Sequence, residues 1–290
     1  MKGFFGYYVK CQGGDGTVSV IFGRSSEASF IQVITEDESY YEGFNSTDCQ
    51  VSKRNFGISV GQNRVDENGM MLDIKSDKLT VRGEVKFGRF TRLPGERDGW
   101  RRCAGESIMG PFQYLPFMEC RHMIVSMHHE ISGFIEINGR IYNFDNGIGY
   151  IEGDRGRGFP IKYFWSQAHG EDIHISASCA VIPYLGIRFK GTICVVLFRG
   201  HQYRLATYHG AKVERFESDM LVIRQKKYKL VIQVLDGRPV RPLMAPTRGK
   251  MSRVIHESVG RRVRYQFIRE DETVFDFTAE RAAYEFSVAG

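Results

Sequence analysis

Hydrophobic and polar residues alternate with a period of two along much of the chain. The clearest case is the pair of runs 133–137 and 140–144, which are separated by Asn138-Gly139. A period of two is typical of β-strands. Asn-Gly is the strongest short hairpin signal, because a type I′ turn needs positive φ at both central residues. The pattern therefore predicts a β-hairpin at this point.

Similar runs of β-branched and aromatic residues recur from end to end, for example 17–22 beside Asp15-Gly16 and 230–235 beside Asp236-Gly237. Segments with a helical period are few. The segment 107–120 contains Pro111 and Pro116 and cannot hold a regular helix along its length. We therefore predict an all-β protein built from antiparallel strands, with one turn of helix at most in 107–120.

A weak internal repeat sets the predicted domain organisation. The runs 71–74, 79–82 and 88–94 are echoed in order and spacing by 220–223, 228–231 and 237–243, and an aromatic cluster ending in Gln opens each half, at 7–12 and 163–167. We predict two related β-domains, 1–146 and 147–290. Long open sheets leave reactive edges, so each half is expected to close into a barrel or half-barrel. Barrels of about eight strands can enclose one small ligand.

Composition narrows the function classes. The chain has 290 residues, 42% of them hydrophobic, and a net charge of +6 that is spread along the sequence. This is the composition of a globular protein without a concentrated basic face, so no nucleic-acid partner is expected. Runs of about 20 apolar residues are absent, which predicts no integral membrane segment.

The cysteines and the N-terminal residues indicate the cellular location to be expected. Six cysteines are scattered without a C-x-x-C pair, so we expect free thiols, no disulfide framework and no zinc site. The first residues turn charged too early, at Lys10 and Asp15, to form the apolar core of a secretory signal. A cytoplasmic location is the expectation.

The densest polar constellation is the segment 149–167. If it is extended, Glu152 and Asp154 face the same side of a strand. Two carboxyls facing one cavity can leave one of them protonated, as a general acid. The other interpretation is an ordinary exposed turn, since the segment is also rich in glycine and arginine.

The histidines suggest no metal site and no cofactor. His128 and His129 are the tightest pair, with Glu130 after them and His122 six positions before His128. Neighbouring residues of a strand point to opposite faces, so both could not ligate one ion. The plain alternative is that one of the two is buried and hydrogen-bonded while the other is exposed.

One long motif resembles a known family. The motif reads Glu152-x-Asp154-Arg155-Gly156-x-x-Phe159-Pro160-x-Lys162-x-x-Trp165-x-Gln167. It resembles the signature of the tocopherol cyclase-like family, as do 107–112, 128–130 and 241–247. The resemblance implies two lipocalin-like domains that arose by duplication. It also implies chemistry in which a prenyl double bond is protonated and a phenol oxygen captures the cation.

The same resemblance suggests roles for individual residues. Asp154 or Glu152 would be the acid, with His128 or His129 as the other candidates. The ligand-binding residues would be Arg155, Phe159, Tyr163, Trp165 and Gln167, with Tyr163 and Trp165 as an aromatic wall and Gln167 orienting the phenol. The aromatic residue that precedes the glycine in the family is Arg155 here, and the acid and tryptophan of its N-terminal motif are replaced. The substrate need not be a tocopherol precursor.

Three functions remain open on the sequence alone. The first is a cyclase-like enzyme acting on a hydrophobic small molecule. The second is a carrier in which the same residues shape an apolar cavity without catalysis. The third is a structural protein whose barrels are filled by its many aromatic side chains. The oligomeric state is not predicted.

Overall fold

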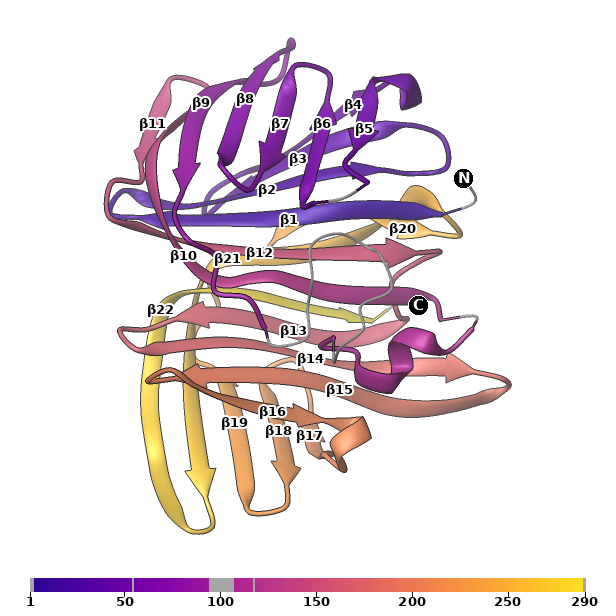
Figure 1. Cartoon of the computed structure of the whole chain (residues 1–290), viewed down its shortest axis with the longest axis vertical. Helices are drawn as coiled ribbons and strands as arrows, with labels where there is room; N and C mark the ends of the chain where they lie inside the picture. The colour runs from indigo at the N-terminus through magenta and orange to yellow at the C-terminus, as the bar shows by residue number, and fades with distance from the viewer. Residues whose placement is uncertain (1–2, 54, 94–106, 117, 289–290) are drawn as a thin grey trace. The chain divides into compact units, whose positions relative to one another are not determined.

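Most of the described part of the chain is β-strand. The computed structural model describes residues 3–53, 55–93, 107–116 and 118–288, and its strands form two large antiparallel sheets (Figure 1). The predicted all-β class is confirmed. No helix in these ranges is both long and apolar enough to cross a bilayer.

The first sheet has the order β4-β3-β2-β1-β12-β10-β9-β8-β7-β6-β5, with β11 beside β10. Its strands are β1 (Phe4–Gly13), β2 (Gly16–Arg24), β3 (Ser29–Thr35), β4 (Ser39–Phe44), β5 (Cys49–Val51), β6 (Gly57–Val60), β7 (Asn63–Asp66), β8 (Gly69–Lys75), β9 (Thr80–Phe87), β10 (Cys120–Ile137), β11 (Arg140–Asn143) and β12 (Gly147–Gly156). Within the described residues this order has two free ends, β4 and β5, so the sheet is a half-barrel and not a closed barrel.

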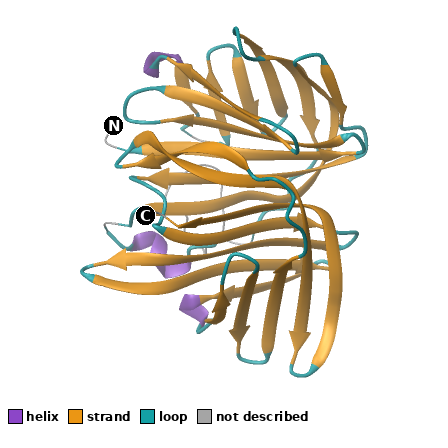
Figure 2. Ribbon diagram, turned by 180° about the vertical axis from the view of Figure 1, so that it is seen from behind, coloured by secondary structure: helices purple, strands orange, loops and turns teal. Residues whose placement is uncertain are grey.

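The second sheet has the order β16-β15-β14-β13-β22-β21-β19-β18-β17, with β20 beside β21. Its strands are β13 (Lys162–His169), β14 (Ile173–Tyr184), β15 (Ile187–Phe198), β16 (His201–Ala206), β17 (Lys212–Phe216), β18 (Met220–Gln225), β19 (Tyr228–Val234), β20 (Arg241–Thr247), β21 (Lys250–Arg269) and β22 (Glu272–Val288). Both sheets are seen from behind in Figure 2.

The two sheets repeat one strand order, as the duplication predicts. In the first, β12 pairs with β1 on one side and leads through β10 and β9 to β8 on the other. In the second, β22 pairs with β13 and leads through β21 and β19 to β18. The repeated runs 71–74 and 220–223 thus lie in the equivalent strands β8 and β18.

Local predictions are confirmed as well. Asn138 and Gly139 have φ values of 49° and 86°, as a type I′ turn requires, and they join β10 to β11. The described residues of the segment 107–120 contain a single short 3₁₀ helix, η2 (Gly110–Tyr114). Elsewhere in the described ranges, the short helices are η1 (Ser46–Asp48) and η3 (Thr207–His209).

By its internal contacts the chain divides into two units. Unit 1 comprises Met1–Ser107, Glu119–Phe159 and Leu243–Val254, and unit 2 comprises Ile108–Met118, Pro160–Pro242 and Ile255–Gly290. Each unit is therefore built from three separate segments, and the segments of the two units alternate along the sequence. The boundary between 146 and 147 stays a prediction, and it lies directly before β12.

Both faces of the central strands are buried. In β1, Val9 and Cys11 belong to the apolar core of unit 1, while the alternating Tyr8 and Lys10 are buried outside that core. In β13 of unit 2, Phe164 lies in the core and the alternating Trp165 is buried outside it. Each unit thus has an apolar core face and a second, polar but buried, face. Buried polar groups of that kind are where ligand chemistry is found.

Candidate functional site

The polar face of unit 1 brings together His122, Glu152 and Asp154. β10 and β12 are antiparallel, with His122 directly opposite Asp154 and Ile124 opposite Glu152. Glu152 and Asp154 are two residues apart on β12, so they project from the same face of the sheet. The three side chains come from segments thirty residues apart in the sequence, and strand pairing alone aligns them.

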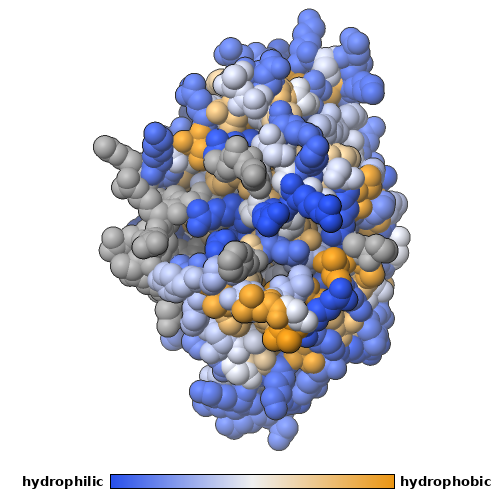
Figure 3. Space-filling view, turned by 90° about the vertical axis from the view of Figure 1, so that its right-hand side faces the viewer, coloured by the Kyte–Doolittle hydropathy of each residue, from blue (hydrophilic) through white to orange (hydrophobic). Residues whose placement is uncertain are grey.

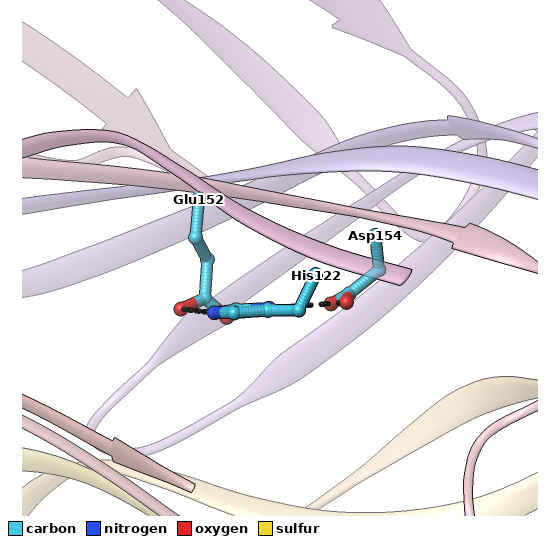
Figure 4. Close-up of side chains that lie close together, drawn as sticks. All are labelled: His122, Glu152 and Asp154. Atoms are coloured by element: carbon cyan, nitrogen blue, oxygen red, sulfur yellow. Dashed lines mark hydrogen bonds and ion pairs between the residues drawn. The ribbon is translucent and has the colours of Figure 1, made fainter. Parts of the chain in front are cut away.

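The imidazole of His122 lies between the two carboxylates (Figure 4). Its Nδ1 is 3.1 Å from an oxygen of Asp154, and its Nε2 is 3.6 Å from an oxygen of Glu152. Glu152 is buried, and His122 and Asp154 are partly buried. The Nδ1 of His122 is thus within hydrogen-bond distance of Asp154, and its Nε2 is within ion-pair distance of Glu152.

Two further groups extend this cluster at its ends. The hydroxyl of Tyr150 donates a hydrogen bond of 2.5 Å to Glu152, and the thiol of Cys120 lies 3.4 Å from Asp154. Burial raises the pKa of Cys120 well above its ordinary value, and the negative charge of Asp154 raises it further. The thiol therefore stays protonated and acts as a donor. We call these five residues, Cys120, His122, Tyr150, Glu152 and Asp154, the acid relay.

The three central groups also have the donor types of a metal site. One ligand atom from each of His122, Glu152 and Asp154 lies within 4.8 Å of the other two. However, the two ring nitrogens face different carboxylates. A cation bound in the ring plane at one nitrogen would lie beside one carboxylate and away from the other. The three groups are arranged as a hydrogen-bonded and ion-paired cluster, and their donor types also suit a divalent metal.

The histidine beside the carboxylates is His122, while His129 lies elsewhere. His129 is buried on the core side of unit 1, where its ring packs against Phe87 and Phe90 at centroid distances of 4.9 and 4.8 Å. Its Nδ1 is 3.0 Å from the hydroxyl of Ser126. Burial lowers the pKa of His129 to about 3, so its ring is neutral. His128 is half-buried, and its pKa is also lowered by burial.

Two other predicted ligand residues also lie in unit 1. Arg155 stands between Asp154 and the end of β12, and strand alternation turns it to the face opposite Asp154. Phe159 packs its ring edge-on against Phe4 at 5.4 Å, and its backbone N–H donates to the carbonyl of Pro246. These contacts hold Phe159 against the first strand of the unit.

The remaining predicted residues, Tyr163, Trp165 and Gln167, lie in unit 2. They alternate along β13, all are buried, and they share the polar face. The hydroxyl of Tyr163 hydrogen-bonds to Glu285, which stands directly opposite Glu257 on the neighbouring strand. Unit 2 thus has its own buried carboxyl pair beside aromatic rings.

A second hydrogen-bonded series runs from Gln167 in the same unit. The side-chain nitrogen Nε2 of Gln167 is 3.0 Å from Nε2 of His169, and Nδ1 of His169 is 3.0 Å from Nδ1 of His174. The amide nitrogen of Gln167 only donates, so Nε2 of His169 accepts, and the proton on Nδ1 of His169 is donated to Nδ1 of His174. The side-chain nitrogen of Gln167 is thereby held at His169.

Sequence reasoning missed His122, Tyr150 and Cys120 as members of the site. Tyr150 could have been found, because it is two residues before Glu152 and so shares its face on an extended strand. His122 and Cys120 could not have been aligned with Asp154 without the strand pairing. The register between β10 and β12 shifts twice, between Ile124 and Ser126 and between Ser126 and His129.

Comparison with known proteins agrees with this architecture. A sequence profile of the tocopherol cyclase-like family matches residues 80–287, and the chain belongs to this family. A search of curated proteins finds no match.

Three solved structures share the fold. Kievitone hydratase from Nectria haematococca has a TM-score of 0.56 at 9% identity, covering 99% of this chain and 89% of that one. CghA in complex with Sch210972 has a TM-score of 0.62 at 9% identity with the same coverage. A Nitrosomonas europaea protein assigned as AttH has a TM-score of 0.51 at 10% identity, covering 98% and 92%. Identities this low show a common fold alone.

Proposed function

We propose that the protein binds a hydrophobic, prenylated small molecule and cyclises it by proton transfer from the acid relay. The observation that carries this proposal is the imidazole of His122 between two carboxylates, since it provides an acid and a base in one place. Membership of the tocopherol cyclase-like family supports it. The hydratase and the CghA complex share only the fold.

The proposed reaction is an isomerisation that needs no co-reactant. A proton leaves His122 or one of the carboxyls and forms a C–H bond with the electron pair of a prenyl double bond. The cation left on the neighbouring carbon is captured by a lone pair of the substrate's phenol oxygen, and the phenol proton returns to the relay. Tyr150 and Cys120 are positioning residues here, because they donate to the carboxylates and hold them toward His122.

The buried aromatic residues of unit 2 are proposed to bind ligand. Tyr163 and Trp165 share a buried face of unit 2, and aromatic rings offer a large apolar surface to a hydrophobic ligand. Gln167 is proposed to hydrogen-bond a polar group of the ligand. A cytoplasmic location remains part of the proposal, as do the lack of a metal and the lack of a nucleic-acid partner.

Substitutions in the acid relay test the proposal. Asp154→Asn and His122→Gln should each lower the turnover of a prenylated quinol at least about a hundredfold, because general acid catalysis contributes about that much or more. Ligand affinity, followed by quenching of tryptophan fluorescence, should change little. The matched control is Asp77→Asn, which makes the same change on an exposed turn.

The same variants separate enzyme from carrier. A carrier would lose affinity with Trp165→Ala and be indifferent to Asp154→Asn. Turnover that persists in Asp154→Asn and His122→Gln contradicts the acid relay. Metal analysis of the purified protein adds a separate check, because stoichiometric metal lost from the His122 variant would show a metal site instead.

A further inference from the structure

The hairpin between β14 and β15 in unit 2 ends in an exposed apolar tip. Leu185 and Gly186 form its two-residue turn, flanked by the paired residues Tyr184 and Ile187. Leu185 is 76% exposed and Ile187 is 64% exposed, the two highest values among the large hydrophobic residues described. Water contact at two such side chains is costly, and a polar pair would have served the turn as well.

The backbone at this tip makes the choice of leucine more unusual. Leu185 and Gly186 have φ values of 47° and 83°, which define the type I′ turn that favours Asn-Gly. Among the described residues, the other non-glycine positions with positive φ are all polar: Asn138, Asn146, Arg199, Lys226, Arg248 and Glu270. Leu185 is the one apolar exception. A leucine thus occupies a position that disfavours it both by solvation and by backbone conformation.

Two basic residues lie next to the tip on one strand of the hairpin. Arg188 and Lys190 follow Ile187 on β15, and both are exposed. From Ile173 to Phe198, which spans both strands, the sequence contains neither Asp nor Glu. Figure 3 is seen from the side toward which the hairpin turn points in Figure 1, and in its lower half apolar atoms gather beside hydrophilic ones.

The hairpin extends beyond its sheet. β15 pairs with β16 only from Ile193 onward, whereas its pairing with β14 continues to Ile187. The pairing of β14 with β13 ends at Ala180, so residues 181–184 and 187–190 form a two-stranded ribbon. The short helix η2 adds a neighbouring aromatic, since its Phe112 ring lies 6.2 Å from that of Phe189 and its Tyr114 is 62% exposed.

We propose that this tip, formed by Leu185 and Ile187 with Arg188 and Lys190, docks on the surface of a bilayer that contains anionic phospholipid. Apolar side chains at a turn can enter the acyl boundary while the basic side chains behind them meet the headgroups. Tyr114 of η2 is also exposed, and tyrosine is enriched at the membrane–water interface. The inference is independent of the proposed cyclisation, because it uses no residue of the acid relay.

Vesicle flotation tests the docking surface. Full-length protein should float with phosphatidylcholine vesicles that contain phosphatidylglycerol, and much less with phosphatidylcholine alone. The double variant L185N/I187T should bind at least about tenfold more weakly, because two apolar side chains no longer enter the boundary. Asn suits the turn at 185, so the variant should unfold at the same temperature or higher. R188Q/K190Q should weaken binding and remove its salt dependence.

A matched control and three contrary outcomes complete the test. I141T alters another exposed hydrophobic residue, 58% exposed on β11 of unit 1, and should leave flotation unchanged. Wild-type protein that does not float, or L185N/I187T that floats like wild type, overturns the proposal. So does a self-associating wild type that L185N/I187T turns into a monomer, since the tip would then be an interface between copies.

Discussion

The side chain of His129 is buried against the apolar core of unit 1 and makes a hydrogen bond through one of its two ring nitrogens. Its Nδ1 contacts Ser126, and the Ser126 hydroxyl donates onward to the carbonyl of His128, so Nδ1 carries the ring proton. Its Nε2 is buried without a hydrogen-bond partner among the described residues. Burial holds the pKa of His129 at about 3, so the charged ring is excluded from the fold.

Acid should therefore destabilise the protein through His129. Below about pH 6.5 the unfolded chain takes up a proton at this residue, whereas the folded protein does not until about pH 3, so stability is lost as the pH falls through that window. Between pH 7.5 and pH 5 the loss from this residue is about 2 kcal/mol. In His129→Phe this part of the pH dependence of the free energy of unfolding should disappear. Urea unfolding at pH 7.5 and at pH 5 measures it. An equal pH dependence in wild type and His129→Phe would show that this histidine is not the cause.

At the scale of elements, β12 is the strand that organises unit 1, and it is rich in glycine for a steric reason. A Cβ at Gly149 would lie 2.3 Å from Nε2 of His129, and one at Gly153 would lie 2.8 Å from the ring of Tyr7. A Cβ at Gly156 would lie 1.9 Å from the backbone oxygen of Glu119. These glycines let neighbouring rings and backbone lie directly on the strand that holds Glu152 and Asp154.

Substitution of Gly156 should therefore be costly. Gly156→Ala meets backbone, which cannot rotate away as a side chain can, so we expect a loss of about 2 to 3 kcal/mol in the free energy of unfolding. Gly237→Ala is the control, since nothing lies within 4 Å of a Cβ built there. Chemical denaturation of the two variants makes the comparison. Equal stabilities would mean that β12 has room to move away from Glu119.

The same strands mark how far the sequence could be interpreted. Alternation and the Asn138-Gly139 turn correctly predicted the class and a hairpin, because both signals are local. The sequence alone could not identify His122 as the histidine of the acid relay. No local pattern marks which residue of β10 lies opposite Asp154, because the register of β10 against β12 shifts between Ile124 and Ser126 and again between Ser126 and His129. Such bulges depend on the partner strand and leave no local pattern.

At the scale of the whole molecule, the two apolar cores contain most of the described cysteines. Cys11 lies in the core of unit 1, and Cys179 and Cys194 lie in that of unit 2. All five described cysteines are free thiols, and Cys103 lies outside the described residues. Burial raises the pKa of Cys11 and of Cys179 to about 12, and that of Cys194 is also raised. Thiols in this state are poor nucleophiles.

Thiol titration should show two distinct states. In the folded protein at pH 8, Cys11, Cys179 and Cys194 should fail to react with a disulfide reagent over minutes, because almost none of each is thiolate. In denaturant without reductant, all six cysteines should react. Recovery of two fewer would reveal a disulfide, and rapid reaction of all six in the native state would contradict the burial of the cores.

Because the segments of the two units alternate along the chain, the order of synthesis limits when each unit can fold. Unit 1 includes Leu243–Val254, and the side chain of Gln32 hydrogen-bonds both the N–H and the carbonyl of Met244 within it. A nascent chain leaving the ribosome therefore cannot complete its first unit until most of the second has been synthesised. Until then Gln32 lacks both of these hydrogen bonds, and incompletely packed chains of this kind are prone to aggregate. A premature stop anywhere before residue 243 removes part of both units at once.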